Sequence, residues 1–241
     1  MKIAIIGYGK MGHMIEEIAL ERGHEIVCRI DTNPSPTFPL KEGVRVFTPE
    51  EGFESDEFKS ADVAIEFTTP TTAKDNILRA WARGVPVVCG TTGWQAQVLL
   101  DEDRRLHDHP MLIWKSNYSV GVNIFFELNK QLASAMATQP QYTPSIVETH
   151  HIHKLDKPSG TAKTLAEQID AMYRGTMYNV RRDIPIESIR EGEVPGTHTV
   201  TWDSEEDTIV ITHIAKGRKG FALGAVLAAE EIANMQHSNL V

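Results

Sequence analysis

The segment ETHHIHKLDKPSGTA, residues 148–162, holds the densest set of acid–base side chains in the sequence. If its first part is extended, alternation places Glu148, His150, Ile152 and Lys154 on one face, with the other histidines opposite. A histidine can donate a proton near neutral pH, and a lysine offers a compact positive charge to a carboxylate. The spacing therefore predicts that His150 and Lys154 project together toward an acidic substrate.

The turn PSGT, residues 158–161, follows this segment and leads into a pattern that predicts a helix from Thr161 to about Tyr173. The first N–H groups of a helix bind anions, so Lys154 together with the turn from Ser159 onward predicts a carboxylate site. The formal net charge of the chain is -9. An anionic ligand of so acidic a protein needs a local positive site of this kind.

Other interpretations of the cluster compete with this one. Three histidines can ligate a metal, but H-H-x-H lacks the i, i+4 pair of a zincin helix and has no cysteine near it, so no metal is expected. The histidines can also be merely structural surface residues. Covalent catalysis is disfavoured, because the sequence has no G-x-S-x-G elbow and Cys28 and Cys89 lie in apolar runs typical of buried thiols.

A glycine-rich turn at the start of the chain predicts a dinucleotide site. The strand-like run KIAIIG leads into a G-x-G-x-x-G motif from Gly7 to Gly12, and a helical pattern follows it. Such a turn brings backbone N–H groups close to a pyrophosphate at the helix N-terminus. Asp31 ends the next strand-like run, where its carboxylate can accept both ribose hydroxyls.

The residues beside Asp31 bear on which cofactor is used. Thr32 follows it where an arginine would favour a 2′-phosphate, so the sequence favours NADH over NADPH. Lys10 or Lys41 can still supply a cation to that phosphate, which leaves use of both cofactors open. The stretches EFTTP at 66–70 and CGTTG at 89–93 end two further strand-like runs, where they either bind the nicotinamide carboxamide or serve as ordinary turns with threonine caps.

The elements that carry these motifs differ between the two halves of the chain. Apolar runs alternate with amphipathic stretches through roughly the first half, which predicts βαβ units and a parallel sheet. After residues 111–117 the patterns predict a helix in GVNIFFELNKQLASAM, a strand in SIVETHHIH, a polar segment RRDIPIESIREGEVPG, and an antiparallel hairpin from THTVTW and TIVITHIA. We expect an α+β domain with an antiparallel or mixed sheet, inserted before a closing helix that returns to the first domain.

Composition excludes several classes of protein. A chain of 241 residues with 41% hydrophobic content can bury a large core, and its acidic balance argues against nucleic acid as a partner. No apolar run approaches the roughly 18 residues that span a bilayer, and the start of the chain has no signal-peptide pattern. We expect a cytoplasmic protein without a membrane partner.

Six stretches together resemble the dihydrodipicolinate reductase family, also called 4-hydroxy-tetrahydrodipicolinate reductase. They are the glycine motif from Gly7 to Gly12, EFTTP at 66–70, CGTTG at 89–93, SNYSVGVN at 116–123, ETHHIHKLDKPSGTA at 148–162 and IREGEVPGTHTV at 189–200. They occur in the family's order over nearly the whole chain. The stretch at 148–162 is highly specific, unlike the glycine motif.

The resemblance implies a Rossmann-type α/β domain at both chain ends, 1–118 and 217–241, and an inserted α+β substrate-binding and tetramerisation domain at 119–216. It implies the diaminopimelate route to lysine, a homotetramer, and hydride transfer from NAD(P)H to a small cyclic dicarboxylate, giving tetrahydrodipicolinate. By the same resemblance His150 is the general acid, Lys154 assists it, and the substrate site is lined by His151, Ser159, Gly160 and Thr161. The cofactor residues it implies, some already indicated by the motifs above, are Gly7, Tyr8, Gly9, Lys10, Met11, Gly12, Asp31, Phe67, Thr68, Gly90, Thr91, Thr92, Asn117, Tyr118, Arg218 and Phe221.

The sequence departs from the family's pattern in two ways, and two other functions compete with that of a reductase of this family. The chain is short for the family, and Thr32 replaces a basic residue often found beside the acid of the second strand, which strengthens the preference for NADH. A different Rossmann reductase would act on another oxo or imino acid. A nucleotide-sensing module would bind NADH without oxidising it, and would have no need for an acid beside a carboxylate site.

Overall fold

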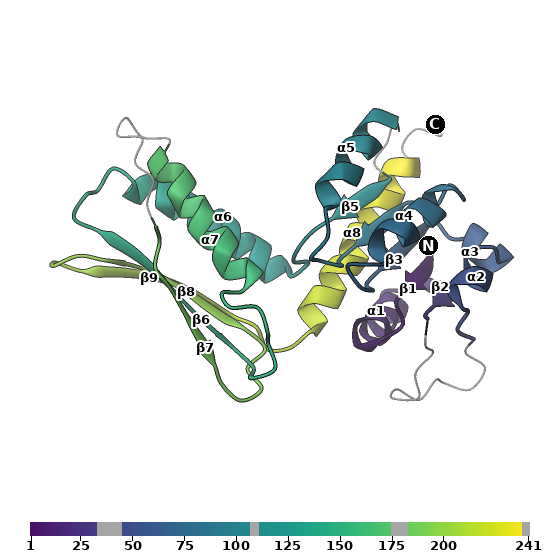
Figure 1. The fold of residues 1–241 in the computed structure, drawn as a ribbon, viewed down its shortest axis with the longest axis horizontal. Helices are drawn as coiled ribbons and strands as arrows, with labels where there is room; N and C mark the ends of the chain where they lie inside the picture. The colour runs from purple at the N-terminus through teal and green to yellow at the C-terminus, as the bar shows by residue number, and fades with distance from the viewer. Residues whose placement is uncertain (33–44, 107–110, 175–182, 238–241) are drawn as a thin grey trace. The chain divides into compact units, whose positions relative to one another are not determined.

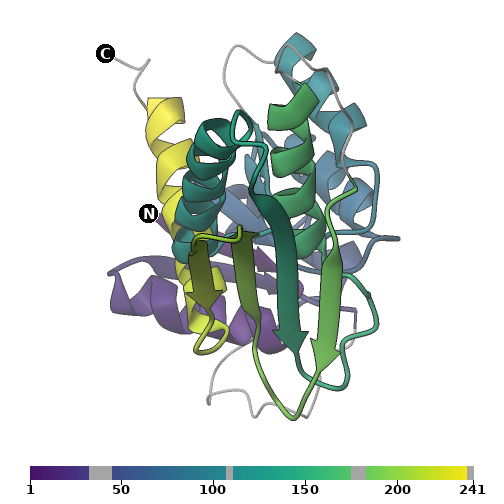
Figure 2. The same cartoon turned by 90° about the vertical axis from the view of Figure 1, so that its left-hand side faces the viewer.

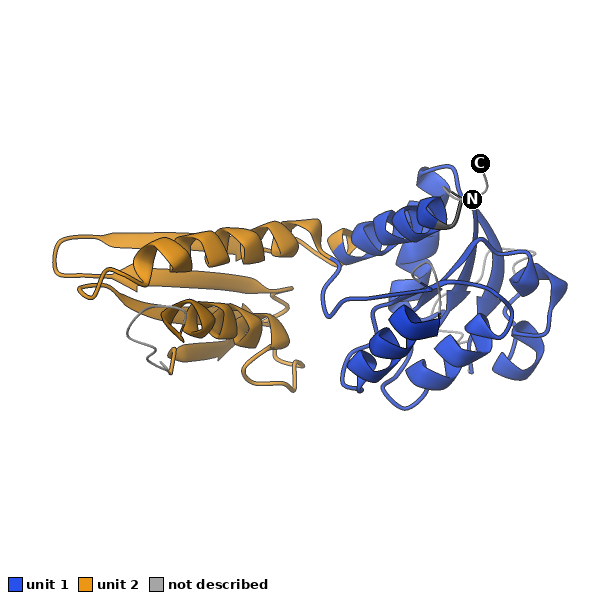
Figure 3. Ribbon diagram, turned by 90° about the horizontal axis from the view of Figure 1, so that it is seen from above, with its two compact units in different colours: residues 1–118, 221–241 blue, residues 119–220 orange. Residues whose placement is uncertain are grey.

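The structure is a computed structural model that describes residues 1–32, 45–106, 111–174 and 183–237. It divides the chain into two compact units, coloured separately in Figure 3. The first unit comprises Met1–Tyr118 and Phe221–Val241, and the second comprises Ser119–Gly220. The first unit is thus built from both ends of the chain, with the second inserted between them.

The first unit contains a five-stranded sheet in the order β2-β1-β3-β4-β5, in which every pair is parallel (Figure 1). Its strands are β1 (Lys2–Ile6), β2 (Glu25–Ile30), β3 (Val63–Glu66), β4 (Val87–Cys89) and β5 (Leu112–Trp114). Its helices are α1 (Lys10–Glu21), α2 (Pro49–Gly52), α3 (Asp56–Lys59), α4 (Ala73–Trp81), α5 (Ala96–Leu106) and nearly all of α8 (Lys219–His237). The parallel Rossmann-type sheet predicted from the sequence is therefore confirmed.

The two faces of this sheet are both buried, because alternate side chains of each strand point to opposite sides. Ile3 and Ile5 of β1 pack into one cluster with apolar residues of α1 and α8. Ala4 and Ile6 pack into the other cluster with residues of α4. A strand that is apolar on both faces is typical of such a sheet, which explains the continuous run KIAII.

The glycine turn lies between β1 and α1. Gly7 has φ +94, and a Cβ there would come 2.1 Å from the backbone oxygen of Phe67. A Cβ on Gly12 would come 2.3 Å from the oxygen of Gly7. Only glycine fits at these positions, so the motif sets the tight turn and lets α1 approach β1 closely.

The second unit is a four-stranded mixed sheet in the order β7-β6-β8-β9, with two helices on one face (Figure 2). Its strands are β6 (Thr143–His150), β7 (Ile186–Arg190), β8 (Thr197–Asp203) and β9 (Thr208–Ile214), and its helices are α6 (Val120–Met136) and α7 (Gly160–Arg174). Strand β6 is parallel to β7 and antiparallel to β8, and β8 and β9 form the predicted antiparallel hairpin. The prediction of an α+β unit is confirmed, and its sheet is mixed.

Two details of the prediction were wrong. Strand β6 ends at His150, so Ile152 and Lys154 lie in the following turn and not on the strand face of Glu148 and His150. The segment described as polar contains β7, whose residues alternate between half-buried and exposed. Strand β7 is short and lies at the edge of the sheet, and its residues are at most half-buried. Its apolar pattern is therefore too weak to be recognised in the sequence.

Among the helices of the described residues, none combines the length and the apolar character that a transmembrane span requires.

Candidate active site

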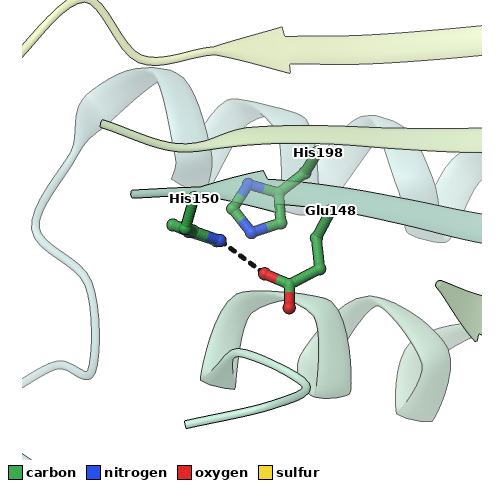
Figure 4. Close-up of side chains that lie close together, drawn as sticks. All are labelled: Glu148, His150 and His198. Atoms are coloured by element: carbon green, nitrogen blue, oxygen red, sulfur yellow. Dashed lines mark ion pairs between the residues drawn. The ribbon is translucent and has the colours of Figure 1, made fainter. Parts of the chain in front are cut away.

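Three buried side chains meet at the end of β6 in the second unit: Glu148, His150 and His198 (Figure 4). Glu148 and His150 are alternate residues of β6, so both point to the face covered by the helices. His198 lies opposite Glu148 on β8 and points to the same face. The Nδ1 atom of His150 lies 2.5 Å from Oε2 of Glu148, which makes an ion pair when the histidine is protonated.

The other oxygen of Glu148 is held by two further groups. Oε1 accepts hydrogen bonds from the guanidinium of Arg190 at 3.0 Å and from the backbone N–H of Ser159 at 3.2 Å. Burial alone would raise the pKa of Glu148, but hydrogen bonds from Ser188, Ser159 and Arg190 lower it to about 2. This carboxylate is therefore ionised at neutral pH although its side chain is fully buried.

His198 forms the second wall of the cluster. Its ring stands nearly perpendicular to that of His150, with 5.0 Å between the ring centroids. Its Nε2 lies 3.2 Å from Oγ of Ser159, and that oxygen accepts the N–H of Ala162 in the first turn of α7. Burial lowers the pKa of His198 to about 4, so this ring is neutral at pH 7.

Burial also lowers the pKa of His150, and the charge of Glu148 acts in the opposite direction. The nearby positive charges of Lys154 and Arg190 reinforce the lowering. A dianionic substrate placed beside this ring would instead favour its protonated form.

Lys154 lies in the turn after β6, where its Nζ is 2.7 Å from Oδ1 of Asp156. Arg190 stabilises this turn by donating to the backbone oxygens of Lys154, at 3.3 Å, and of Asp156, at 2.6 Å. His151 is half-buried beside the strand end. Thus the turn brings Lys154 near His150, although alternation along the strand does not.

The predicted anion site lies at the start of α7. Gly160 is the first residue of this helix, Thr161 the second, and Ser159 precedes them. A Cβ built on Gly160 would meet nothing within 4 Å, so the space beside the helix N-terminus is open among the described residues. The backbone N–H of Gly160 helps to lower the pKa of the Asp156 carboxyl, so an anionic ligand at this helix start would compete with that carboxylate.

The donor atoms of Glu148, His150 and His198 all lie within 4.8 Å of one another, which is a spacing that could suit a metal ion. However, the carboxylate is already paired with the guanidinium of Arg190. A cation at this place would have to replace or lie beside that charge. The residues present therefore suit an acid–base network better than a metal centre.

The first unit contains a separate cavity of about 390 Å³ at the glycine turn. The residues that line it include Gly7, Gly9, Asp31, Phe67 and Thr68. Oδ2 of Asp31 accepts the backbone N–H of Tyr8 at 2.6 Å, which fixes the carboxylate at the rim of the turn. The cavity, the glycine turn and the acid fit the adenosine and pyrophosphate parts of a dinucleotide.

The two threonine-containing turns at the ends of β3 and β4 are joined to each other. The backbone N–H of Thr68 donates to Oγ1 of Thr91 at 2.8 Å. The ring of Phe67 packs against Gly90, where a Cβ would come 2.1 Å from it. The turns therefore form one surface at the carboxyl ends of the strands, which is where ligands of this fold bind.

The remaining predicted cofactor residues lie in different places. Lys10 and Met11 begin α1, Thr92 is exposed beside Thr91, and Asn117 and the buried Tyr118 end the first segment of the first unit. Phe221 belongs to the first unit, whereas Arg218 belongs to the second. Lys41 lies outside the described residues.

Three residues of the candidate site were not predicted: Glu148 as a participant, Arg190 and His198. Alternation in the sequence places Glu148 on the same face as His150, but it gives no role to the Glu148 carboxylate. Arg190 and His198 are about 40 to 50 positions from His150, and only the strand pairing brings them together. The stretch IREGEVPGTHTV, which contains both, was the one available signal.

Comparisons with known proteins agree with this arrangement. A family profile described as "Dihydrodipicolinate reductase, N-terminus" matches residues 1–118, and one described as "Dihydrodipicolinate reductase, C-terminus" matches residues 121–241. The 4-hydroxy-tetrahydrodipicolinate reductase of Christiangramia forsetii is 43% identical over 235 residues, covering 95% of this chain and 91% of the relative. That of Staphylococcus aureus is 34% identical over 244 residues, covering 97% and 95%.

Among solved structures, a dipicolinate-bound dihydrodipicolinate reductase from Paenisporosarcina sp. TG-14 is similar with a TM-score of 0.73. It is 23% identical, and the match covers 97% of this chain and 95% of that one. This similarity supports the fold.

Proposed function

The chain belongs to the dihydrodipicolinate reductase family, and from this premise we propose how its own residues carry out the family's reaction. It is an NAD(P)H-dependent oxidoreductase that reduces 4-hydroxy-tetrahydrodipicolinate to tetrahydrodipicolinate in the diaminopimelate route to lysine. The observation that carries this conclusion is the match of both family profiles across nearly the whole chain.

His150 is the general acid in our proposal. The bound nicotinamide supplies the hydride. The 4-hydroxyl group of the substrate first leaves as water, which gives a conjugated C=C–C=N ring. Hydride addition to this ring moves electrons toward nitrogen and leaves an enamine-like intermediate that needs a proton. His150 is the candidate donor because its ring lies at the strand end beside the anion site, with an ionised carboxylate behind it.

Lys154 and the start of α7 bind the substrate's carboxylates. Ser159, Gly160 and Thr161 place the helix N-terminus beside His150, and His151 lines the same turn. Lys154 pairs with Asp156 in the structure, so a carboxylate of the substrate would compete for the same ammonium. Two anion sites near one acid favour a dicarboxylate, because a monocarboxylate would leave buried donors unpaired.

We further propose that NADH is the preferred cofactor. The cavity at the glycine turn is lined by the carboxylates of Asp31, Glu50 and Asp75. These charges repel a 2′-phosphate. Arg79 also lines the cavity, but it donates to the backbone oxygen of Pro49 and stacks over the ring of Phe53.

The second unit also offers a surface for the homotetramer implied by the family. The face of its sheet opposite α6 and α7 carries mainly threonine, valine and isoleucine. Val210 and Ile214 of β9 are exposed by 53% and 65%. Flat, weakly charged sheet faces of this kind suit association with a second copy.

We place the enzyme in the cytoplasm. Cys28 and Cys89 are both buried free thiols, as the apolar runs around them indicated. Reduced thiols and the pool of reduced nicotinamide cofactors are both features of that compartment.

The test is oxidation of NADH and of NADPH by the purified chain, with the substrate made in the cuvette from pyruvate and aspartate semialdehyde by the preceding synthase. We expect oxidation that depends on the synthase and is faster with NADH than with NADPH at equal concentration. Faster oxidation of NADPH would overturn the proposed preference alone. Binding of NADH without synthase-dependent oxidation would favour a different substrate or a sensor.

A further inference from the structure

The carboxylate of Glu148 is buried beside the imidazole of His150. We propose that Glu148 is a positioning residue, which holds the imidazole of His150 with Nδ1 toward the carboxylate and Nε2 toward the substrate. The proposal rests on the proposed role of His150 as the acid. In this role Glu148 orients the imidazole of His150 and does not itself transfer a proton.

The first support is the geometry of the pair. Glu148 and His150 project from the same face of β6, so their side chains are neighbours without any adjustment of the backbone. The Oε2 atom of Glu148 lies 2.5 Å from Nδ1 of His150 (Figure 4). An ionised carboxylate at that distance favours the form of the ring that carries its hydrogen on Nδ1.

The second support is that the carboxylate itself is fixed. Its other oxygen, Oε1, is bound by Arg190 from β7 and by the N–H of Ser159 from the start of α7. Rotation of the carboxylate would break both contacts. Groups on two separate segments therefore determine where Oε2 points.

The third support lies at the opposite edge of the imidazole ring. A Cβ at Gly196 would come 3.1 Å from Nε2 of His150 and 3.2 Å from its Cδ2. Glycine at this position, where φ is +149, leaves that edge of the ring uncrowded. The Nδ1 edge thus faces a carboxylate, while any side chain at position 196 would crowd the Nε2 edge.

The charged groups around the ring explain why orientation matters. Glu148 from β6, Arg190 from β7, His198 from β8 and Lys154 from the turn all face His150. Arg190 and Lys154 oppose protonation of the ring, and His198 is neutral at pH 7. Glu148 is the one anion of this described set, so its loss would weaken both the orientation and the charge of the acid.

The proton path follows from this orientation. In the charged state His150 carries hydrogens on both nitrogens, and the Nε2 hydrogen is transferred to the enamine-like intermediate. The ring is left neutral with its remaining hydrogen on Nδ1, the nitrogen that lies 2.5 Å from Oε2 of Glu148. The carboxylate keeps its charge throughout, in keeping with its pKa of about 2.

The mutational test compares Glu148→Gln with Glu167→Gln, an exposed residue of α7 that serves as the matched control. We expect kcat of Glu148→Gln to fall about 10- to 100-fold, with KM and NADH affinity changed by less than about threefold. The alkaline limb of kcat should move to lower pH, because removal of the anion makes the ring harder to protonate. Glu148→Asp, which keeps the charge at a longer reach, should recover part of kcat.

A second measurement needs no substitution at position 148. Nitrogen NMR of the ¹⁵N-histidine-labelled wild-type protein, with His150 assigned by the signal lost in His150→Gln, reports which ring nitrogen carries hydrogen in the neutral state. We expect hydrogen on Nδ1. A neutral ring with hydrogen on Nε2, or a kcat and pH limb in Glu148→Gln equal to those of the control, would overturn the proposal.

The activity of His150→Gln distinguishes failure of the positioning role of Glu148 from failure of the acid role of His150. Loss of activity in His150→Gln together with normal activity in Glu148→Gln would reject only the positioning role. Normal activity in His150→Gln would reject the acid assignment itself and, with it, the role of Glu148.

Discussion

At the scale of single residues, the catalytic proposal depends on charges that are held in place by hydrogen bonds. Glu148 stays ionised in a buried position because Arg190 and Ser159 donate to it. The sequence alone indicated His150 and Lys154, since both lie within one short motif. It could not indicate His198 or Arg190, because their proximity depends on the strand register of β6 with β8 and with β7.

Lys154→Ala tests the proposed carboxylate contact. The side chain is about a quarter exposed and pairs with Asp156, so its removal should leave the fold intact. We expect KM for the substrate to rise and kcat to fall, because the ammonium of Lys154 both binds the substrate and orients it for the reaction. Steady-state kinetics with the coupled synthase measures both.

The matched control for Lys154→Ala is Lys130→Ala, in which the lost lysine lies on α6 and pairs with Glu127 at the surface. It should have wild-type kinetics. Equal and small effects in the two variants would contradict the assignment of Lys154.

At the scale of elements, strands β6 and β8 and the start of α7 bury polar side chains, and removing such side chains from water costs free energy. His198 is 4% exposed and lies on the same face as the core residues Val200 and Trp202. Periodicity in the sequence predicted these elements and their faces well. It failed for β7 and for the end of β6, where half-exposed residues and a turn give no clear apolar pattern.

The pH dependence of stability should reveal the buried His198. Its pKa is about 4 when folded and about 6.5 when unfolded, so the unfolded chain binds more protons between these values. The stabilisation is complete above pH 6.5 and is lost as pH falls toward 4, at a rate of up to about 1.4 kcal/mol per pH unit. His150 and His213 contribute in the same direction.

The measurement is the urea midpoint of unfolding of the wild type and of His198→Gln at pH 7 and at pH 5. We expect the midpoint to fall less in the variant between the two pH values. The same fall in both proteins would show that His198 is not held neutral by burial.

At the scale of the whole molecule, the chain combines a Rossmann-type unit made from both chain ends with an inserted unit that carries His150, the proposed acid. The order of the motifs along the sequence was enough to predict this organisation. The fold alone could not identify the substrate, because many unrelated reactions use a Rossmann-type unit. The specific stretch at 148–162 and the family match supplied that identity.

The association of copies of the chain can be tested by a substitution on the open face of the sheet in the second unit. Ile214→Glu places a charge on the open face of the sheet in the second unit, where the wild-type side chain is 65% exposed. If this face joins copies of the chain, the variant should form smaller species, because burying an unpaired carboxylate is costly. Light scattering coupled to size-exclusion chromatography measures the mass.

Leu106→Glu is the control for that experiment, since Leu106 is a comparably exposed apolar residue on α5 of the first unit. It should keep the wild-type mass. An unchanged mass of a tetramer in Ile214→Glu would contradict the proposed interface.

The central claim, that His150 donates the proton while the nucleotide unit supplies the hydride, is tested most directly by His150→Gln. The measurement pairs kcat in the synthase-coupled assay with the Kd for NADH of the same protein. We predict that kcat falls by about 10²- to 10⁴-fold while NADH affinity stays within about twofold of wild type. A kcat close to wild type, with NADH still bound, would contradict the account.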